Sequence, residues 1–192
     1  MIAINRIGVW KELTMGFRQI IHFALLFTLI STSSQSWGFS FPEPPLFKAI
    51  KSGDKETARS LLTEDPKLAF STNFTGMNPI HMAISHNDFE TFQYILQVAP
   101  TAAALKTRSR KSTPLHLVAE ADFDSSRYID TLLELAPTTA FEQDSQGKTP
   151  LDYASNEIRV KILSFFRSPT CPVKVRPDQL DYLEMFLKEI SK

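Results

Sequence analysis

Three short stretches decide how this chain folds: Asn-Pro-Ile-His at 78–81, Thr-Pro-Leu-His at 113–116 and Thr-Pro-Leu-Asp at 149–152. Their prolines, at 79, 114 and 150, are 35 and 36 residues apart. A degenerate copy, Pro-Leu-Phe-Lys at 45–48, places its proline 34 residues before the first of them. Proline suits the first turn of a helix, where its missing N–H needs no partner, and a preceding Thr is a good N-cap. Each copy therefore predicts the start of a helix.

The rest of each unit repeats in the same order. A small residue follows the proline stretch in every copy: Ala49, Ala83, Val118 and Ala154. Pairs of bulky apolar residues come next: Leu61-Leu62, Ile95-Leu96, Leu132-Leu133 and Ile162-Leu163. Proline-containing segments at 65–69, 99–103 and 136–140 then close the first three units. A helix pair of this size cannot bury its apolar face alone, so the repeat predicts an all-α array of stacked units.

The chain divides into four units: 44–77, 78–112, 113–148 and 149–167. A proline-rich connector and a helix follow at 168–192. Apolar residues recur there at helical spacing: Leu180, Leu183, Phe186, Leu187 and Ile190. We expect this helix to fold back over the last unit as a cap. The alternative is a helix that binds a partner or a membrane surface, but its acidic side argues against an anionic membrane.

These units resemble the ankyrin repeat family, whose repeat is about 33 residues long and carries the same Thr-Pro-Leu-His element. The resemblance covers about residues 44–167 and is strongest in the third and fourth units. It implies an ankyrin solenoid of about four helix pairs with a C-terminal capping helix. Lys111 departs from the family pattern because it stands where Gly76 and Gly147 stand in their units. We therefore expect a distorted turn in the third unit.

The resemblance also implies where a partner binds, because ankyrin proteins usually use their loop tips and the exposed face of each first helix. Carried over to this sequence, the loop positions are Phe74, Thr75, Met77, Ser109, Arg110, Ser112, Ser145, Gln146 and Lys148. The first-helix positions are Ser85, His86, Glu120, Ala121, Asn156 and Glu157. Phe74, Met77 and Arg110 are the leading anchors, since a loop offers little core to an apolar side chain and binding hot spots favour aromatics and Arg. The alternative for Phe74 is that it packs on its own unit.

Charge and composition argue against several classes of protein. Lys and Arg together number 21, as do Asp and Glu, so the basic excess typical of nucleic-acid binders is missing. The run Lys-Thr-Arg-Ser-Arg-Lys at 106–111 is a local exception, in the loop between the second and third units. It is either a solvated loop or a docking element for an acidic partner surface. Cys171 is the only cysteine, which rules out an intramolecular disulfide and a cysteine-based zinc site.

No catalytic, cofactor-binding or metal-binding constellation stands out. The resemblance assigns His81 and His116 to structural hydrogen bonds, and His86 has no second ligand at a suitable spacing. Cys171 has no nearby histidine, and the chain has no glycine-rich phosphate loop. We expect a non-enzymatic protein without a cofactor that is monomeric when unbound. A small enzyme on this scaffold lacks a site.

The N-terminal region has the pattern of an export signal. Residues 20–30 form an uncharged apolar run, preceded by Arg18 and followed by small polar residues at 31–36. The run is shorter than the roughly 20 residues that a membrane-spanning helix needs. Its length and flanks are typical of a secretory signal peptide. A start at Met15 fits equally well, and the alternative for the run is a buried core helix.

We expect a signal peptide at 1–36, cleaved after Ser36, and a linker at 37–43. An exported fold without disulfides fits a bacterial periplasm, with the extracellular space as the alternative. Together with the resemblance, this predicts a protein-binding ankyrin module that does not act on nucleic acid or, once cleaved, on membranes. It is either a periplasmic inhibitor or self-protection (immunity) protein that binds an exported enzyme such as a cell-wall hydrolase, or a secreted effector that binds a host protein.

Overall fold

The first helix of each unit begins at the proline that the sequence marks. The computed structural model describes residues 42–169 and 171–190. The four first helices are α2 (Pro45–Ser52), α4 (Pro79–Ser85), α6 (Pro114–Glu120) and α8 (Pro150–Tyr153). Proline occupies the first turn of each one, where the backbone has no intrahelical acceptor for an N–H group.

Each first helix is followed by a second, antiparallel helix. These are α3 (Lys55–Glu64), α5 (Phe89–Val98), α7 (Ser126–Leu135) and α9 (Asn156–Arg167). Asp54 and Asp88 cap α3 and α5 by accepting hydrogen bonds from the backbone N–H groups three residues on. Short 3₁₀ helices, which begin at the closing prolines, end the first three units: η1 (Pro66–Phe70), η2 (Pro100–Ala104) and η3 (Pro137–Phe141).

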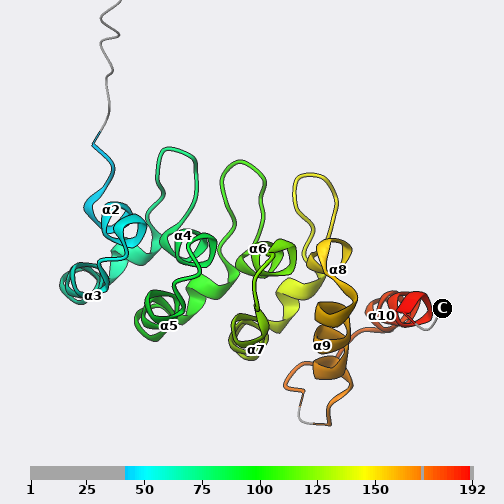
Figure 1. Ribbon diagram of the computed structural model, residues 1–192. Helices are drawn as coiled ribbons and strands as arrows, with labels where there is room; N and C mark the ends of the chain where they lie inside the picture. The colour runs from blue at the N-terminus through cyan, green and yellow to red at the C-terminus, as the bar shows by residue number, and fades with distance from the viewer. Residues whose placement is uncertain (1–41, 170, 191–192) are drawn as a thin grey trace, which may run out of the picture. The chain divides into compact units, whose positions relative to one another are not determined.

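The helix pairs stack side by side. The first helices form one row and the second helices another, and the loops that connect the units project beside the first row (Figure 1). One continuous apolar core runs through the stack and includes Leu62, Leu96, Leu133 and Leu163. The described residues contain no strand. The predicted all-α array of about four helix pairs is therefore confirmed.

Helix α10 (Pro177–Ile190) packs against α9 and caps the array. It buries Leu183 and Phe186, as the spacing predicts, but Leu180 remains 46% exposed. The guanidinium of Arg159 from α9 lies 4.8 Å from the centre of the Phe186 ring and 3.5 Å from the carboxylate of Glu189. The cap is thus held by apolar contacts and by one arginine that contacts a ring and a carboxylate together.

The fourth unit corrects one part of the predicted partner surface. Only five residues separate Pro150 from Asn156, against nine between the corresponding starts of α4 and α5. Helix α8 therefore makes a single turn, and Ser155 already caps α9 by accepting from the N–H of Ile158. Asn156 and Glu157 begin the second helix, so the prediction that they lie on the face of the first helix is wrong.

The turn at Lys111 is a second correction. Its φ angle is 56°, in the left-handed region that Gly76 (77°) and Gly147 (75°) also occupy. The turn is therefore kept and not distorted. Loop length accommodates it, because the Lys111 N–H donates to the carbonyl of Thr107, four residues back, whereas the two glycines reach only three residues back.

The expected signal peptide at 1–36 and most of the linker at 37–43 lie outside the described residues. None of the helices in the described part of the chain is both long and apolar enough to cross a membrane.

Truncation of Leu96 or Leu133 to Ala should lower the free energy of unfolding by roughly 2–5 kcal/mol, because each change leaves a cavity in the core. The two side chains are 4% and 1% exposed. Leu135→Ala is the matched control on α7, since Leu135 is 46% exposed and its truncation should change stability little. Urea unfolding of the three variants measures the difference. Equal midpoints for all three would contradict the packing described above.

Candidate functional site

Three loops project beside the first helices, and we call them finger loops one (71–78), two (105–113) and three (142–149) (Figure 1). A backbone hydrogen bond closes the base of each loop. The N–H groups of Asn73, Thr107 and Asp144 donate to the carbonyls of Met77, Ser112 and Lys148 at 2.9, 3.0 and 2.9 Å. The tips are therefore short and well-defined turns.

Backbone hydrogen bonds also join each finger loop to the next. The Arg108 N–H donates to the Gly76 carbonyl at 2.8 Å, and the Ser145 N–H donates to the Arg110 carbonyl at 2.7 Å. The first contact is close enough that a Cβ on Gly76 would lie 2.7 Å from the Cβ of Arg108. Glycine is thus required there by both its φ angle and the neighbouring loop. The three tips form one connected row.

Two buried histidines tie the first helices to the finger loops. The Nε2 atoms of His81 and His116 lie 3.1 Å from the carbonyls of Ser112 and Lys148, each in the next loop along the chain. A carbonyl only accepts, so Nε2 carries the proton in both rings. The Nδ1 atom of His116 accepts from the N–H and hydroxyl of Thr113. The structural role predicted for these histidines is confirmed.

Burial keeps these two rings neutral. It lowers the pKa of His81 to about 4, against a smaller opposing effect of the hydrogen bond with Ser112. Burial also lowers the pKa of His116, with the hydrogen bond to Lys148 opposing it. The Nδ1 atom of His81 is buried without a hydrogen-bond partner, so a proton there would place an unpaired charge inside the fold.

Phe74 lies near the tip of finger loop one and is 66% exposed. Asn73 shapes this loop, because its Oδ1 accepts from the N–H groups of Thr75 and Met77. Thr75 is exposed, whereas Met77 is half-buried. Of the two apolar anchors that the sequence suggests, Phe74 therefore presents far more of its side chain to a partner.

Arg110 is held against the fold by contacts that the sequence does not indicate. Its guanidinium lies 3.1 Å from the Glu120 carboxylate and 3.2 Å from the Tyr153 hydroxyl, and it stacks over the Tyr153 ring at 5.5 Å. It thus links finger loop two to α6 and α8. Arg110 and Glu120, both predicted partner-binding positions, thus pair with each other within the chain, and their role in partner binding stays a prediction.

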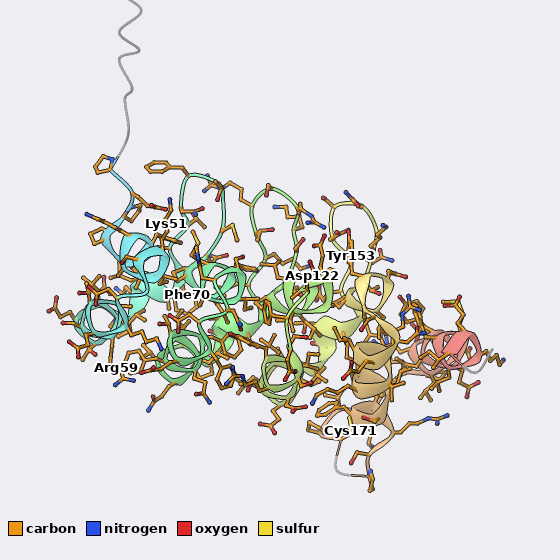
Figure 2. All side chains as sticks on the ribbon, viewed as in Figure 1. Lys51, Arg59, Phe70, Asp122, Tyr153 and Cys171 are labelled. Carbon is orange, nitrogen blue, oxygen red and sulfur yellow. The ribbon has the colours of Figure 1, made fainter. Side chains whose placement is uncertain are left out.

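Tyr153 is the residue that sequence reasoning missed. It lies at the base of finger loop three (Figure 2), where its hydroxyl is 2.7 Å from Asp144 Oδ2 and 3.2 Å from Gln146 Oε1. The hydrogen bond with Asp144 raises the pKa of Tyr153. Lys148 places its ammonium 5.0 Å from the ring centre. Its contacts with Asp144, Gln146 and Lys148 are local, but the contact with Arg110 forms only because stacking brings finger loop two beside α8.

Ser112 is a further correction to the predicted surface. It is buried, its N–H donates to the Thr107 hydroxyl, and its carbonyl accepts from His81. It belongs to the base of finger loop two and does not reach the tip, because the longer loop puts the tip earlier in the sequence.

The other predicted positions fall into two groups. The exposed loop positions are Ser109, Ser145, Gln146 and Lys148. A second group lies at helix ends: Ser85 ends α4, His86 and Ala121 directly follow α4 and α6, and Asn156 and Glu157 begin α9. The structure therefore brings the loop positions together in the finger-loop row and places the second group elsewhere.

Acidification should destabilise the fold through His81. Its pKa is about 4 in the folded state against an ordinary value of 6.5, so the unfolded chain takes up the proton first as the pH falls. The stabilisation is fully present above pH 6.5 and is lost as the pH drops towards 4, by on the order of 3 kcal/mol.

Urea unfolding across this pH range checks the prediction. His81→Gln keeps an N–H donor for the Ser112 carbonyl but does not titrate, so its stability should vary less with pH than that of the wild type. Stability curves that stay parallel through the whole range would contradict the assigned role of His81.

The comparisons with known proteins agree with this geometry. A family model described as ankyrin repeats (many copies) matches residues 46–96, which run from α2 to α5. A search of curated protein sequences found no match to the chain. The third unit, beyond the matched segment, repeats the same helix pair, 3₁₀ helix and finger loop. Residues 46–96 therefore belong to the ankyrin repeat family, whose repeats serve as modules for protein–protein interaction.

Proposed function

We propose that this chain is an exported, non-enzymatic ankyrin module that binds and inhibits a periplasmic or secreted enzyme, such as a cell-wall hydrolase. The observation that carries the binding part of the proposal is the row of finger loops, with Phe74 exposed on loop one and basic residues on loop two. Export is supported by the sequence pattern at 1–36. Inhibition would protect the cell that makes both proteins.

The state of the reactive side chains favours binding over catalysis. The ring N–H groups of His81 and His116 donate hydrogen bonds to backbone carbonyls within the fold. The Cys171 thiol is half-buried and lies 3.5 Å from the Val173 carbonyl. Among the described residues, no three His, Cys, Asp or Glu side chains come together where they could hold a metal ion. The contacts of the two histidines within the fold support a binding role for the chain.

The connected loops favour a tight, inhibitory interaction. The hydrogen bonds from Arg108 to Gly76 and from Ser145 to Arg110 fix the loop tips relative to one another before any partner arrives. A surface that is already ordered loses little conformational entropy on binding. Protease–inhibitor complexes show how a standard-sized rigid interface reaches high affinity in this way.

Affinity purification tests the proposal directly. A tagged chain is isolated from the compartment to which it is exported, the retained proteins are identified by mass spectrometry, and the activity of a retained enzyme is measured with and without added chain. We expect an exported hydrolase to co-purify and to lose activity as the chain is added. A retained enzyme that keeps its full rate would contradict inhibition, and a host protein retained in its place would favour an effector role.

Phe74→Ala should weaken binding of the retained partner by about 1–3 kcal/mol, because an exposed aromatic at a loop tip has the features of a binding hot spot. Phe70→Ala is the matched control. Phe70 is an exposed phenylalanine as well, at 45%, but it ends η1 and lies outside the finger-loop tips (Figure 2). Calorimetry measures both affinities. The same loss for both variants would argue against a site on the finger loops.

The export part of the proposal can be tested separately, by locating the N-terminus of the mature chain. N-terminal sequencing of the chain recovered from the periplasm should begin at Trp37, because the small residues at 34 and 36 suit a signal peptidase cleavage site. Recovery of the uncleaved chain from the cytoplasm alone would contradict the export part of the proposal.

A further inference from the structure

Lys111 adopts a backbone conformation that disfavours its own side chain. Its φ angle of 56° lies in the left-handed region, where a Cβ crowds the following carbonyl, and the equivalent positions are Gly76 and Gly147. The Lys111 side chain is exposed and makes no hydrogen bond, ion pair or ring contact with the described residues. The longer loop accommodates the backbone, but no contact of the Lys111 side chain with the described residues offsets the strain.

At Asn87, a side-chain hydrogen bond compensates for the same kind of backbone strain. It has a similar φ angle of 51°, but its Oδ1 accepts a 3.0 Å hydrogen bond from the hydroxyl of Tyr128, a buried residue of the core. Residues kept in a strained conformation without a structural role are found where function requires them. The contrast between Asn87 and Lys111 therefore indicates that the Lys111 side chain acts outside the chain.

The basic residues of finger loop two have two different environments. Lys106 pairs with Glu142, and Arg110 pairs with Glu120. The side chains of Arg108 and Lys111 are exposed and have no acidic partner among the described residues. Finger loops one and two contain no Asp or Glu, and the two carboxylates of loop three, Glu142 and Asp144, are engaged within the fold. The positive charge of Arg108 and Lys111 is thus not neutralised by a carboxylate of the finger loops.

An exposed aromatic side chain lies on the loop tip that adjoins Arg108. The hydrogen bond from the Arg108 N–H to the Gly76 carbonyl joins the tips of loops one and two. Phe74, two residues before Gly76, is thereby held on the neighbouring tip with 66% of its surface exposed. The row thus presents an aromatic ring on loop one and, on loop two, two cations without an acidic partner among the described residues.

We infer that the tip of finger loop two binds an acidic segment of the partner protein, with Arg108 and Lys111 receiving its carboxylates and Phe74 covering an adjacent apolar side chain. This inference rests on the proposed function and adds the chemistry of the partner. A nucleic acid fits less well, because the chain as a whole has no net positive charge. Lys106 and Arg110 are already paired with carboxylates, so few basic residues of loop two are left for a row of phosphates.

Lys111→Gly provides a test with two opposite readouts. The variant removes the backbone strain, so the melting temperature of the purified chain should rise by about 2–4 °C. It also removes one exposed ion pair, so the affinity for a dye-labelled synthetic peptide rich in Glu and Phe should fall by roughly two- to fivefold in fluorescence anisotropy at low salt. Arg108→Ser combined with Lys111→Gly should lower the affinity further and flatten its salt dependence.

Asn87→Gly is the matched control. It makes the same kind of change at the other left-handed position, but it deletes the hydrogen bond with Tyr128, so the melting temperature should not rise and peptide affinity should stay unchanged. The inference is overturned if the wild type does not bind the peptide, if Lys111→Gly binds it as tightly as the wild type, or if Lys111→Gly lowers the melting temperature. Tighter binding of single-stranded DNA than of the peptide would overturn it as well.

The same variants separate this inference from the proposed function. If tagged Lys111→Gly retains and inhibits the exported enzyme as well as the wild type does, the role of loop two is wrong and the proposed function stands. If the peptide results follow the expectation but no exported enzyme is retained by the wild type, the acidic-segment site stands and the inhibitor proposal fails.

Discussion

A helix pair in this chain leaves an apolar face that only a neighbouring helix pair or cap can cover. Leu62, Leu96, Leu133 and Leu163 all lie in one continuous core. Helix α3 packs against α5, and α7 packs against η2 and α9. This requirement forces the units into register, since a unit that slipped would expose a row of leucines to water. The row of first helices and the position of every finger loop follow from it.

Polar contacts across the units then fix the loops that the stacking brings together. His81 and His116 each reach the carbonyl at the base of the next finger loop. In the fourth unit, Asp152 replaces the histidine, and it lies 3.2 Å from the hydroxyl of Tyr182 on α10. Burial raises the pKa of Tyr182 to about 12, so this hydroxyl stays protonated and able to donate. The cap thus supplies the partner that a further repeat would otherwise provide.

The same scaffold explains how a nearly neutral chain can present a local charge. The cations that serve the fold, Lys106 and Arg110, lie where the loops meet carboxylates of neighbouring segments. Arg108 and Lys111, in the same hydrogen-bonded loop, have no acidic partner among the described residues. A rigid loop can therefore keep opposite charges on the same chain apart, and this separation makes electrostatic selection of a partner possible.

The sequence by itself determined the features that depend on local pattern and period. It predicted where the first helices begin and that Leu96 and Leu133 are buried, because the prolines and the bulky apolar pairs recur in every unit at similar spacing. The resemblance to ankyrin repeats implied that His81 and His116 support the fold. Only the tertiary structure decided the rest. Arg110 meets Tyr153 because stacking joins residues 43 positions apart, and Lys111 keeps a glycine conformation because its loop has one more residue. Such contacts depend on how neighbouring backbones approach, which no periodic pattern in a single chain records.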